Sequence, residues 1–170
     1  FVNAPSASAT PNGTNVMDDH HDVNPDEATV IPVNVDGTAV VELYTNDRGT
    51  PLDPSDDYNF AGRISRANDV DRFKFVALGT GNATITIQRG AGTPNLIPTV
   101  LIQDSTDATI ASGAASTNGF LQLTFPVNRG EEIRVLVSSG GGSQGEYTLQ
   151  LASPAFVDDF ADAREVDKAH

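Results

Sequence analysis

The sequence predicts an all-β protein, an antiparallel β-sandwich similar to a jelly roll, with eight to ten strands. Three observations support this fold class. From about residue 29 to residue 152, apolar and polar residues alternate with a period of two, which is the side-chain period of a strand. The apolar positions are rich in β-branched and aromatic residues, which favour strands. Clusters of Gly, Asn, Asp and Pro divide the region into segments of strand length.

The clearest strand covers residues 71–78, where Phe73 and Phe75 fall on one face and Arg72 and Lys74 on the other. The same reasoning predicts strands over 29–35, 39–45, 60–65, 83–87, 98–103, 108–111, 120–125, 133–137 and 147–151. In each clear strand, two alternate apolar residues should face the core. They are Phe73, Phe75, Ile85, Ile87, Leu123, Phe125, Val135, Val137, Leu149 and Leu151.

The predicted domain organisation has three parts within 170 residues. Residues 1–17 form a polar N-terminal arm, whose Ala, Ser, Thr, Asn, Pro and Gly content is too low in apolar surface to fold alone. Residues 18–152 form the sandwich, and residues 153–170 form an acidic C-terminal tail. Within the tail, apolar residues recur at helical spacing over 156–169, which predicts a short helix.

Composition excludes several classes of protein. There is no Cys, so disulfides, thiolate metal sites and cysteine nucleophiles are absent. No apolar run approaches the roughly 20 residues that a membrane span needs. A formal net charge of -13 disfavours nucleic acid as a partner. Residues 1–60 carry 11 acids and one base, whereas residues 61–152 carry seven of each, so the first third of the chain concentrates carboxylates.

Several short motifs follow one another in a characteristic order: Asp18-Asp-His-His-Asp22, Gly62-Arg-Ile64, Asp69-Val-Asp-Arg-Phe-Lys-Phe75, Thr99-Val-Leu-Ile-Gln-Asp104, Ile133-Arg-Val135 and Gly145-Glu-Tyr-Thr-Leu149. In these motifs, over residues 18–152, the chain resembles the bacterial pre-peptidase C-terminal domain, a β-sandwich appended to secreted proteases and found in the collagen-binding modules of clostridial collagenases. The stretch 36–59 is longer than in that family, and we interpret it as an insertion with one extra strand and an acidic loop.

The resemblance implies a calcium site, because in that family the acidic start and the Asp-x-Asp turn meet around the ion. Carried over by position, the ligands are Asp18, Asp19, Asp22, Asp69 and Asp71. The residue types agree, since calcium takes six to eight oxygen ligands and needs several converging acids. One calcium would then join the N-terminal arm to the sandwich. The alternative is that these acids are ordinary solvated loop residues.

Three rival sites are weaker. An EF-hand-like loop starting at Asp22 has Glu27 where glycine is needed and Val33 where an acid is needed. His20 and His21 are adjacent, so in an extended segment they point to opposite sides and do not share one zinc ion. A second acidic group is typical of turn chemistry, with another cation as the alternative: it consists of Asp47, Asp53, Asp56 and Asp57.

The sequence favours a protein that is not an enzyme. His20 and His21 lie in the acidic segment before the first predicted strand and His170 is the last residue, so none can sit in a core-held catalytic triad. A nucleophile elbow, a phosphate loop and a dinucleotide fingerprint are all missing. A glycosidase pair of carboxylates is not excluded by residue type, but there is no Trp and there are only three Tyr to form a sugar platform.

Three functional hypotheses remain. The first is a non-catalytic, calcium-stabilised structural or binding module of a secreted or cell-surface protein, which the resemblance implies. The second is a self-assembling extracellular filament subunit, in which residues 1–17 join a neighbouring copy head-to-tail at a strand edge. The third is a carbohydrate- or collagen-binding accessory domain of a secreted hydrolase, for which the scattered Tyr44, Tyr58 and Tyr147 offer little aromatic surface.

Overall fold

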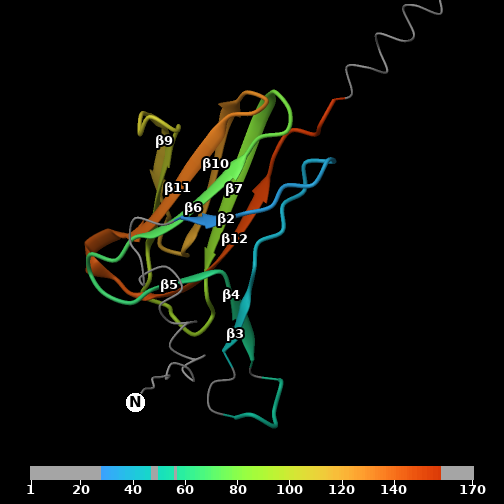
Figure 1. The fold of residues 1–170 in the computed structure, drawn as a ribbon. Coiled ribbons are helices and arrows are strands. Elements are labelled where there is room, and N and C mark those ends of the chain that lie inside the picture. The colour runs from blue at the N-terminus through green and yellow to red at the C-terminus, as the bar shows by residue number, and fades with distance from the viewer. Residues whose placement is uncertain (1–27, 47–49, 56, 158–170) are drawn as a thin grey trace, which may run out of the picture.

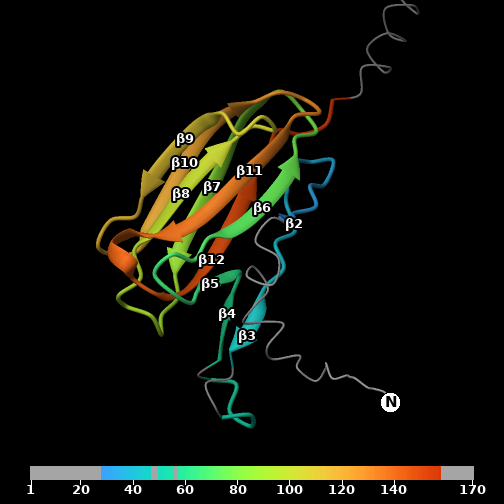
Figure 2. The ribbon, with the colours of Figure 1, turned by 60° about the vertical axis from the view of Figure 1, so that its left-hand side comes forward.

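The computed structural model describes residues 28–46, 50–55 and 57–157. Two β-sheets lie face to face, as Figures 1 and 2 show. The first sheet has the order β10 (Phe120–Val127), β7 (Gly81–Arg89), β12 (Gly145–Ala152) and β5 (Gly62–Ile64). The second has the order β2 (Thr29–Val30), β6 (Asp71–Val76), β11 (Glu132–Ser139), β8 (Pro98–Gln103) and β9 (Thr109–Ala114).

A two-stranded sheet, formed by β3 (Tyr44–Asn46) and β4 (Tyr58–Phe60), extends from one end of the sandwich (Figure 1). A single 3₁₀ turn, Gly140–Gly142, connects β11 to β12. The pairs within the sheets are antiparallel except β2–β6, which is parallel. The predicted β-sandwich is therefore confirmed. Within the described ranges, no helix has the length and hydropathy that a membrane span requires.

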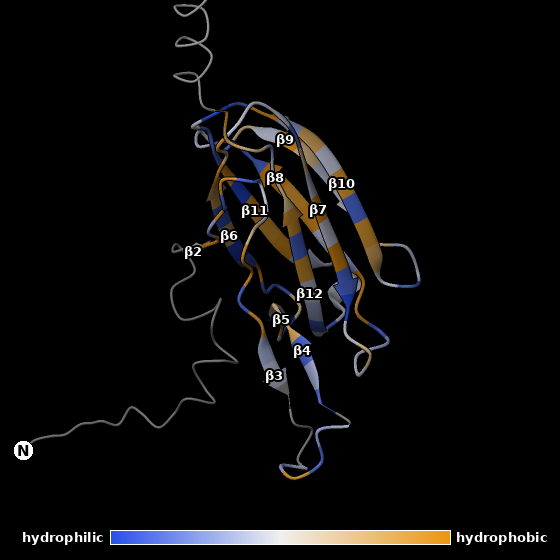
Figure 3. Cartoon of the chain, turned by 90° about the vertical axis from the view of Figure 1, so that its right-hand side faces the viewer, coloured by the Kyte–Doolittle hydropathy of each residue, from blue (hydrophilic) through white to orange (hydrophobic). Residues whose placement is uncertain are grey.

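The core lies between the two sheets, where the inner faces of their strands meet. Figure 3 shows the alternation of hydrophobic and hydrophilic residues along β7, β10 and β12 that produces one apolar and one polar face. Phe73 and Phe75 are 2% and 1% exposed and face the same side, as their spacing predicts. Nine of the ten residues that were expected in the core are buried: Phe73, Phe75, Ile85, Ile87, Phe125, Val135, Val137, Leu149 and Leu151.

Leu123 is the exception, because it is only partly buried and packs against the rim of the core. It belongs to β10, the outermost strand of its sheet, so the opposite sheet covers it less completely than it covers the central strands. Its side chain packs closely on Gly113 of β9, where an added Cβ would lie only 3.0 Å from Leu123 Cδ2.

The segment 29–45 differs from the two strands predicted there. Only Thr29–Val30 pairs with β6, and β3 starts at Tyr44. Between them the chain folds back on itself in a small hairpin, where Asn34 N–H donates to Thr38 O at 2.7 Å and Val40 N–H donates to Pro32 O at 2.9 Å. Pro32 has no N–H to continue the ladder, which limits the length of the preceding strand.

The predicted strand 60–65 is likewise two strands. β4 pairs with β3, whereas β5 pairs with β12, and Ala61 lies between them. The change of partner keeps both strands short. The predicted helix over 156–169 falls almost wholly outside the described residues; Phe156 itself is not helical, and its N–H donates to Val35 O at 2.7 Å. The division into arm, sandwich and tail stays a prediction.

Candidate functional site

Three motifs of the sequence meet inside the sandwich at one buried hydrogen bond. Asp71 is the first residue of β6 in one sheet, and Tyr147 lies in β12 of the other. The Tyr147 hydroxyl donates to Asp71 Oδ2 at 2.6 Å, and both residues are 0% exposed. Because hydrogen bonds to buried polar groups offset the cost of removing them from water, this contact fixes the Asp71 carboxyl in one position.

Gly62 in β5 completes this contact. A Cβ at position 62 would overlap the Tyr147 hydroxyl and the Asp71 carboxyl oxygen Oδ2. Glycine therefore leaves the space in which the two side chains meet. The Gly-x-Ile, Asp-x-Asp and Gly-x-Tyr-x-Leu motifs are thus linked by one packing requirement.

Asp69 is the second buried carboxyl, at 2% exposure, and it lies two residues before Asp71. The turn after β5 positions it: Ser65 donates to Asp69 Oδ2 through its backbone N–H at 2.6 Å and through its hydroxyl at 2.9 Å. The Asp69 N–H in turn donates to Arg66 O at 3.1 Å and closes the turn. Both carboxyls are therefore held in place where the loop enters β6.

Two of the five predicted calcium ligands lie within the described residues. Asp69 and Asp71 are both buried, Asp71 at the first position of β6 and Asp69 two residues before it, whereas Asp18, Asp19 and Asp22 lie outside the described residues. Considering only the residues that the structure places, no group of three or more His, Cys, Asp or Glu side chains lies close enough to hold a metal ion. The carboxyl oxygens of Asp69 and Asp71 are ligands of the type that calcium takes, and the other ligands remain predictions.

In the second acidic group, Asp53 shows turn chemistry. The Asp53 carboxylate accepts hydrogen bonds from the hydroxyl and the backbone N–H of Ser55, the latter at 3.0 Å. These bonds favour the ionised form and lower the pKa of Asp53. Asp47 and Asp56, like His20 and His21, fall outside the described residues.

The sequence analysis did not identify the hydrogen bond of Tyr147. A signal was present, since a tyrosine at an inward-facing strand position must place its hydroxyl near a partner. Ser65 and Glu146 were also missed. Glu146 is 6% exposed and accepts a hydrogen bond from the Tyr58 hydroxyl at 3.1 Å, so it lies near the same end of β12 as Tyr147.

Comparison with known proteins supports the fold. No family model matches the chain, and no curated protein sequence is significantly similar to it. Among solved structures, it is similar to the pre-peptidase C-terminal domain of a collagenase from Bacillus anthracis, with a TM-score of 0.50, 18% identity, and coverage of 75% of this chain and 97% of that domain.

Two further similar structures have lower scores. One is tripeptidyl peptidase 2, with a TM-score of 0.46, 11% identity, and coverage of 74% of this chain and 10% of that one. The other is a family 35 carbohydrate-binding module from an environmental isolate, with a TM-score of 0.38, 17% identity, and coverage of 77% and 90%. At 18% identity, the similarity to the collagenase domain supports the fold alone, a β-sandwich.

Proposed function

We propose that this chain is a non-catalytic, calcium-stabilised extracellular module of the pre-peptidase C-terminal type, which serves as a structural or binding unit of a secreted or cell-surface protein. The observation that carries the proposal is the pair of buried carboxyls, Asp69 and Asp71, two residues apart at 2% and 0% exposure. Burying a carboxylate is costly unless hydrogen bonds and an opposite charge compensate it.

The surrounding residues support a cation beside this pair. Tyr147 and Ser65 each donate to one Oδ2 atom and hold the two carboxyls in fixed positions. Fixed oxygen ligands lower the cost of ordering a calcium site. The acids that precede β2 in the sequence, Asp18, Asp19 and Asp22, would supply further ligands and so link the N-terminal arm to the sandwich. Calcium sites of extracellular modules have dissociation constants of about 10⁻⁴–10⁻³ M, so millimolar calcium is the concentration at which the site should be tested.

The test is thermal unfolding of the full chain in millimolar calcium and in excess chelator. If the site exists, calcium stabilises the native state by mass action, by about 2.7 kcal/mol at a hundred times its dissociation constant. Asp69→Asn and Asp71→Asn should each reduce this calcium-dependent shift in Tm. Asp53→Asn is the matched control, because Asp53 only forms a turn with Ser55, and it should retain the full shift.

Equal Tm values with and without calcium, together with no heat of calcium binding at millimolar concentration, would contradict the proposal. If Asp53→Asn abolished the calcium-dependent shift in Tm and Asp71→Asn retained it, calcium would bind at the Asp53 turn and not at the start of β6, which would also contradict the proposal.

A further inference from the structure

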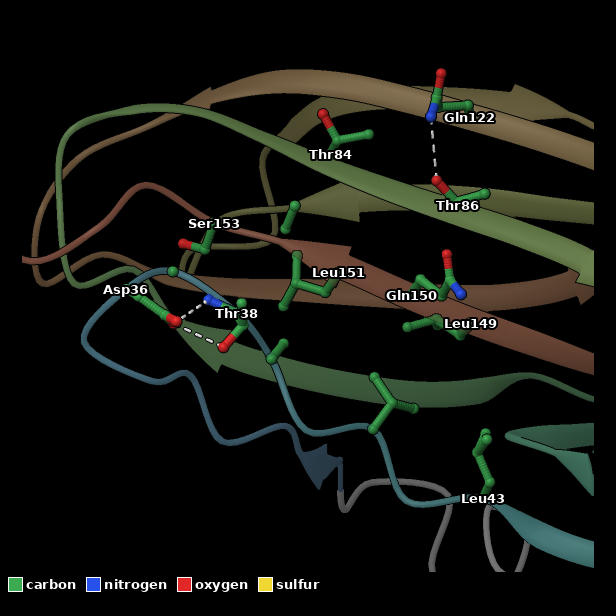
Figure 4. Close-up of a pocket in the computed structure, with 14 residues that line it drawn as sticks. Asp36, Thr38, Leu43, Thr84, Thr86, Gln122, Leu149, Gln150, Leu151 and Ser153 are labelled. Atoms are coloured by element: carbon green, nitrogen blue, oxygen red, sulfur yellow. Dashed lines mark hydrogen bonds between the residues drawn. The ribbon is translucent and has the colours of Figure 1, made fainter.

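A hollow of about 590 Å³ lies on the outer face of the first sheet, between β12 and the segment 36–43 (Figure 4). Its volume falls within the range of about 300–1,000 Å³ that is typical of small-ligand sites. It is separate from the buried carboxyls, since neither Asp69 nor Asp71 lines it.

The floor of the hollow consists of amide and hydroxyl side chains from three neighbouring strands. Gln122 of β10, Thr86 of β7 and Gln150 of β12 occupy one row across the sheet, and Thr84 lies in the next row. Figure 4 shows these four side chains together, with the Gln122 amide Nε2 donating to Thr86 Oγ1 at 3.2 Å. Gln150 is exposed, and its carboxamide has no hydrogen-bond partner within the described part of the chain.

The edge of β12 adds backbone groups to this floor. Two backbone hydrogen bonds lie on the edge of β12 that faces away from β7. Tyr147 O accepts from Ala61 N–H at 2.7 Å, and Ser153 N–H donates to Gly37 O at 2.9 Å. Backbone groups of alternate residues point to the same edge of a strand, so the N–H and C=O of Leu149 also face this edge. They provide one more donor and one more acceptor beside Gln150.

The opposite wall is apolar. Val41 and Leu43 line it, and Leu43 is 47% exposed. Asp36 is the one ionisable residue among the described residues that line the hollow, and its carboxylate accepts hydrogen bonds from the Thr38 N–H at 2.9 Å and the Thr38 hydroxyl at 2.6 Å. The hollow therefore combines an uncharged hydrogen-bonding floor with an aliphatic wall.

This combination matches a ligand that has many hydroxyl groups, an apolar C–H face and no charge. A carboxamide offers a donor and an acceptor side by side, which suits neighbouring hydroxyls. We propose that the hollow binds a short segment of a neutral carbohydrate. The proposal rests on the binding role proposed above and assigns it a site and a class of ligand.

An extended peptide fits the same edge less well. The free stretch of β12 ends at Ala152, which forms a bridge with Thr38, and at Tyr147, which pairs with Gly62. A peptide added as a strand could pair only with the few residues of β12 between Tyr147 and Ala152. Strands in proteins are usually longer than this. The closed ends favour a compact ligand.

The experiment measures binding of the full chain, in calcium, to soluble neutral polysaccharides by calorimetry and affinity gel electrophoresis. The probes are β-glucan, xylan and galactomannan, with polygalacturonate as an anionic polysaccharide and gelatin as an extended polypeptide. We expect at least one neutral polysaccharide to bind. Gln122→Ala and Gln150→Ala should each weaken that binding by about tenfold, because each removes a donor and an acceptor.

Gln144→Ala is the matched control, since Gln144 is exposed in the loop before β12 and does not line the hollow. It should bind as the unaltered chain does. Leu43→Arg, which places a long charged side chain on the exposed wall, should abolish binding while the Tm stays within a few degrees.

Three results would overturn the proposal: no binding of any neutral polysaccharide, binding only of polygalacturonate or gelatin, or binding that Gln122→Ala and Gln150→Ala leave unchanged. The calcium dependence of the Tm is measured separately, so failure here would leave the calcium-stabilised module intact.

Discussion

Tyr147 contributes a hydroxyl to a core that is otherwise largely apolar, and this hydroxyl donates to the Asp71 carboxyl. Tyr147→Phe keeps the ring and removes the donor, so Asp71 Oδ2 loses a hydrogen bond in a buried position. We expect the free energy of unfolding to fall by about 2 kcal/mol. Urea denaturation measured at constant calcium concentration checks this value.

Tyr58→Phe is the graded control for that measurement. The Tyr58 hydroxyl also donates to a carboxylate, Glu146 Oε1, but at 3.1 Å and in a partly buried position. Tyr58→Phe should therefore lower the free energy of unfolding less than Tyr147→Phe does. If Tyr58→Phe lowered the free energy of unfolding as much as Tyr147→Phe or more, the buried Tyr147–Asp71 hydrogen bond would contribute no more to stability than the partly buried one.

Gly62 matters because its lack of a side chain leaves room for the Tyr147 hydroxyl and the Asp71 carboxyl. In Gly62→Ala the new methyl group would collide with the Tyr147 hydroxyl and the Asp71 carboxyl, and overpacking of this kind costs about 1–3 kcal/mol. Gly140→Ala is the matched control, because a Cβ there meets its nearest neighbours at 3.7 Å, an ordinary contact distance. Thermal unfolding of both variants should show a large loss of Tm at position 62 and a small one at position 140; similar losses would contradict this explanation.

At the scale of an element, the turn between β8 and β9 depends on one carboxylate. Asp104 Oδ1 accepts from the Thr106 hydroxyl at 2.7 Å, the Thr106 N–H at 2.8 Å and the Ala108 N–H at 3.0 Å. These bonds, the one from the Thr106 side chain above all, lower the pKa of Asp104 below its ordinary value of 3.8. The ionised form is the one that the folded turn prefers.

The sign of the pH dependence follows from that direction. Since the folded pKa lies below the unfolded one, the contribution of Asp104 to stability is complete above the unfolded pKa and is lost as the pH falls through the folded pKa. We expect an NMR titration to show a pKa of Asp104 below 3.8, and Thr106→Ala to raise it toward that value. An Asp104 pKa that Thr106→Ala leaves unchanged would mean that these hydrogen bonds do not hold the turn.

At the scale of the whole molecule, the polar arm of residues 1–17 predicts assembly. An arm of about 15 residues can reach up to about 50 Å when extended, enough to cross a neighbouring domain. We expect the full chain to associate head-to-tail at high concentration in calcium, and removal of residues 1–15 to abolish the association. Light scattering and electron microscopy test this; a monomeric full chain, or an association that survives the truncation, would leave the arm as a linker.

Much of the sandwich was predictable because the alternation that specifies a strand is local. Phe73 and Phe75 reveal the buried face of β6 without reference to the rest of the chain, and the strand Pro98–Gln103 occurs at the predicted residues. The motif that contains Asp69 and Asp71 likewise indicated where a loop enters a strand, and both residues lie at that point. Whether Asp18, Asp19 and Asp22 join them remains a prediction.

Other features depend on residues that are far apart in the sequence. Leu123 alternates as a core residue does, yet it is only partly buried because β10 is at the edge of its sheet, and strand order is a property of the assembled sheets. The hydrogen bond from Tyr147 to Asp71 joins positions 76 residues apart. The fold class and the inward face of most strands follow from the local sequence, because a period of two needs no distant partner. The edge strands and the polar contacts of the core follow from the assembled structure, because strand pairing and the packing of the two sheets join residues far apart in the chain.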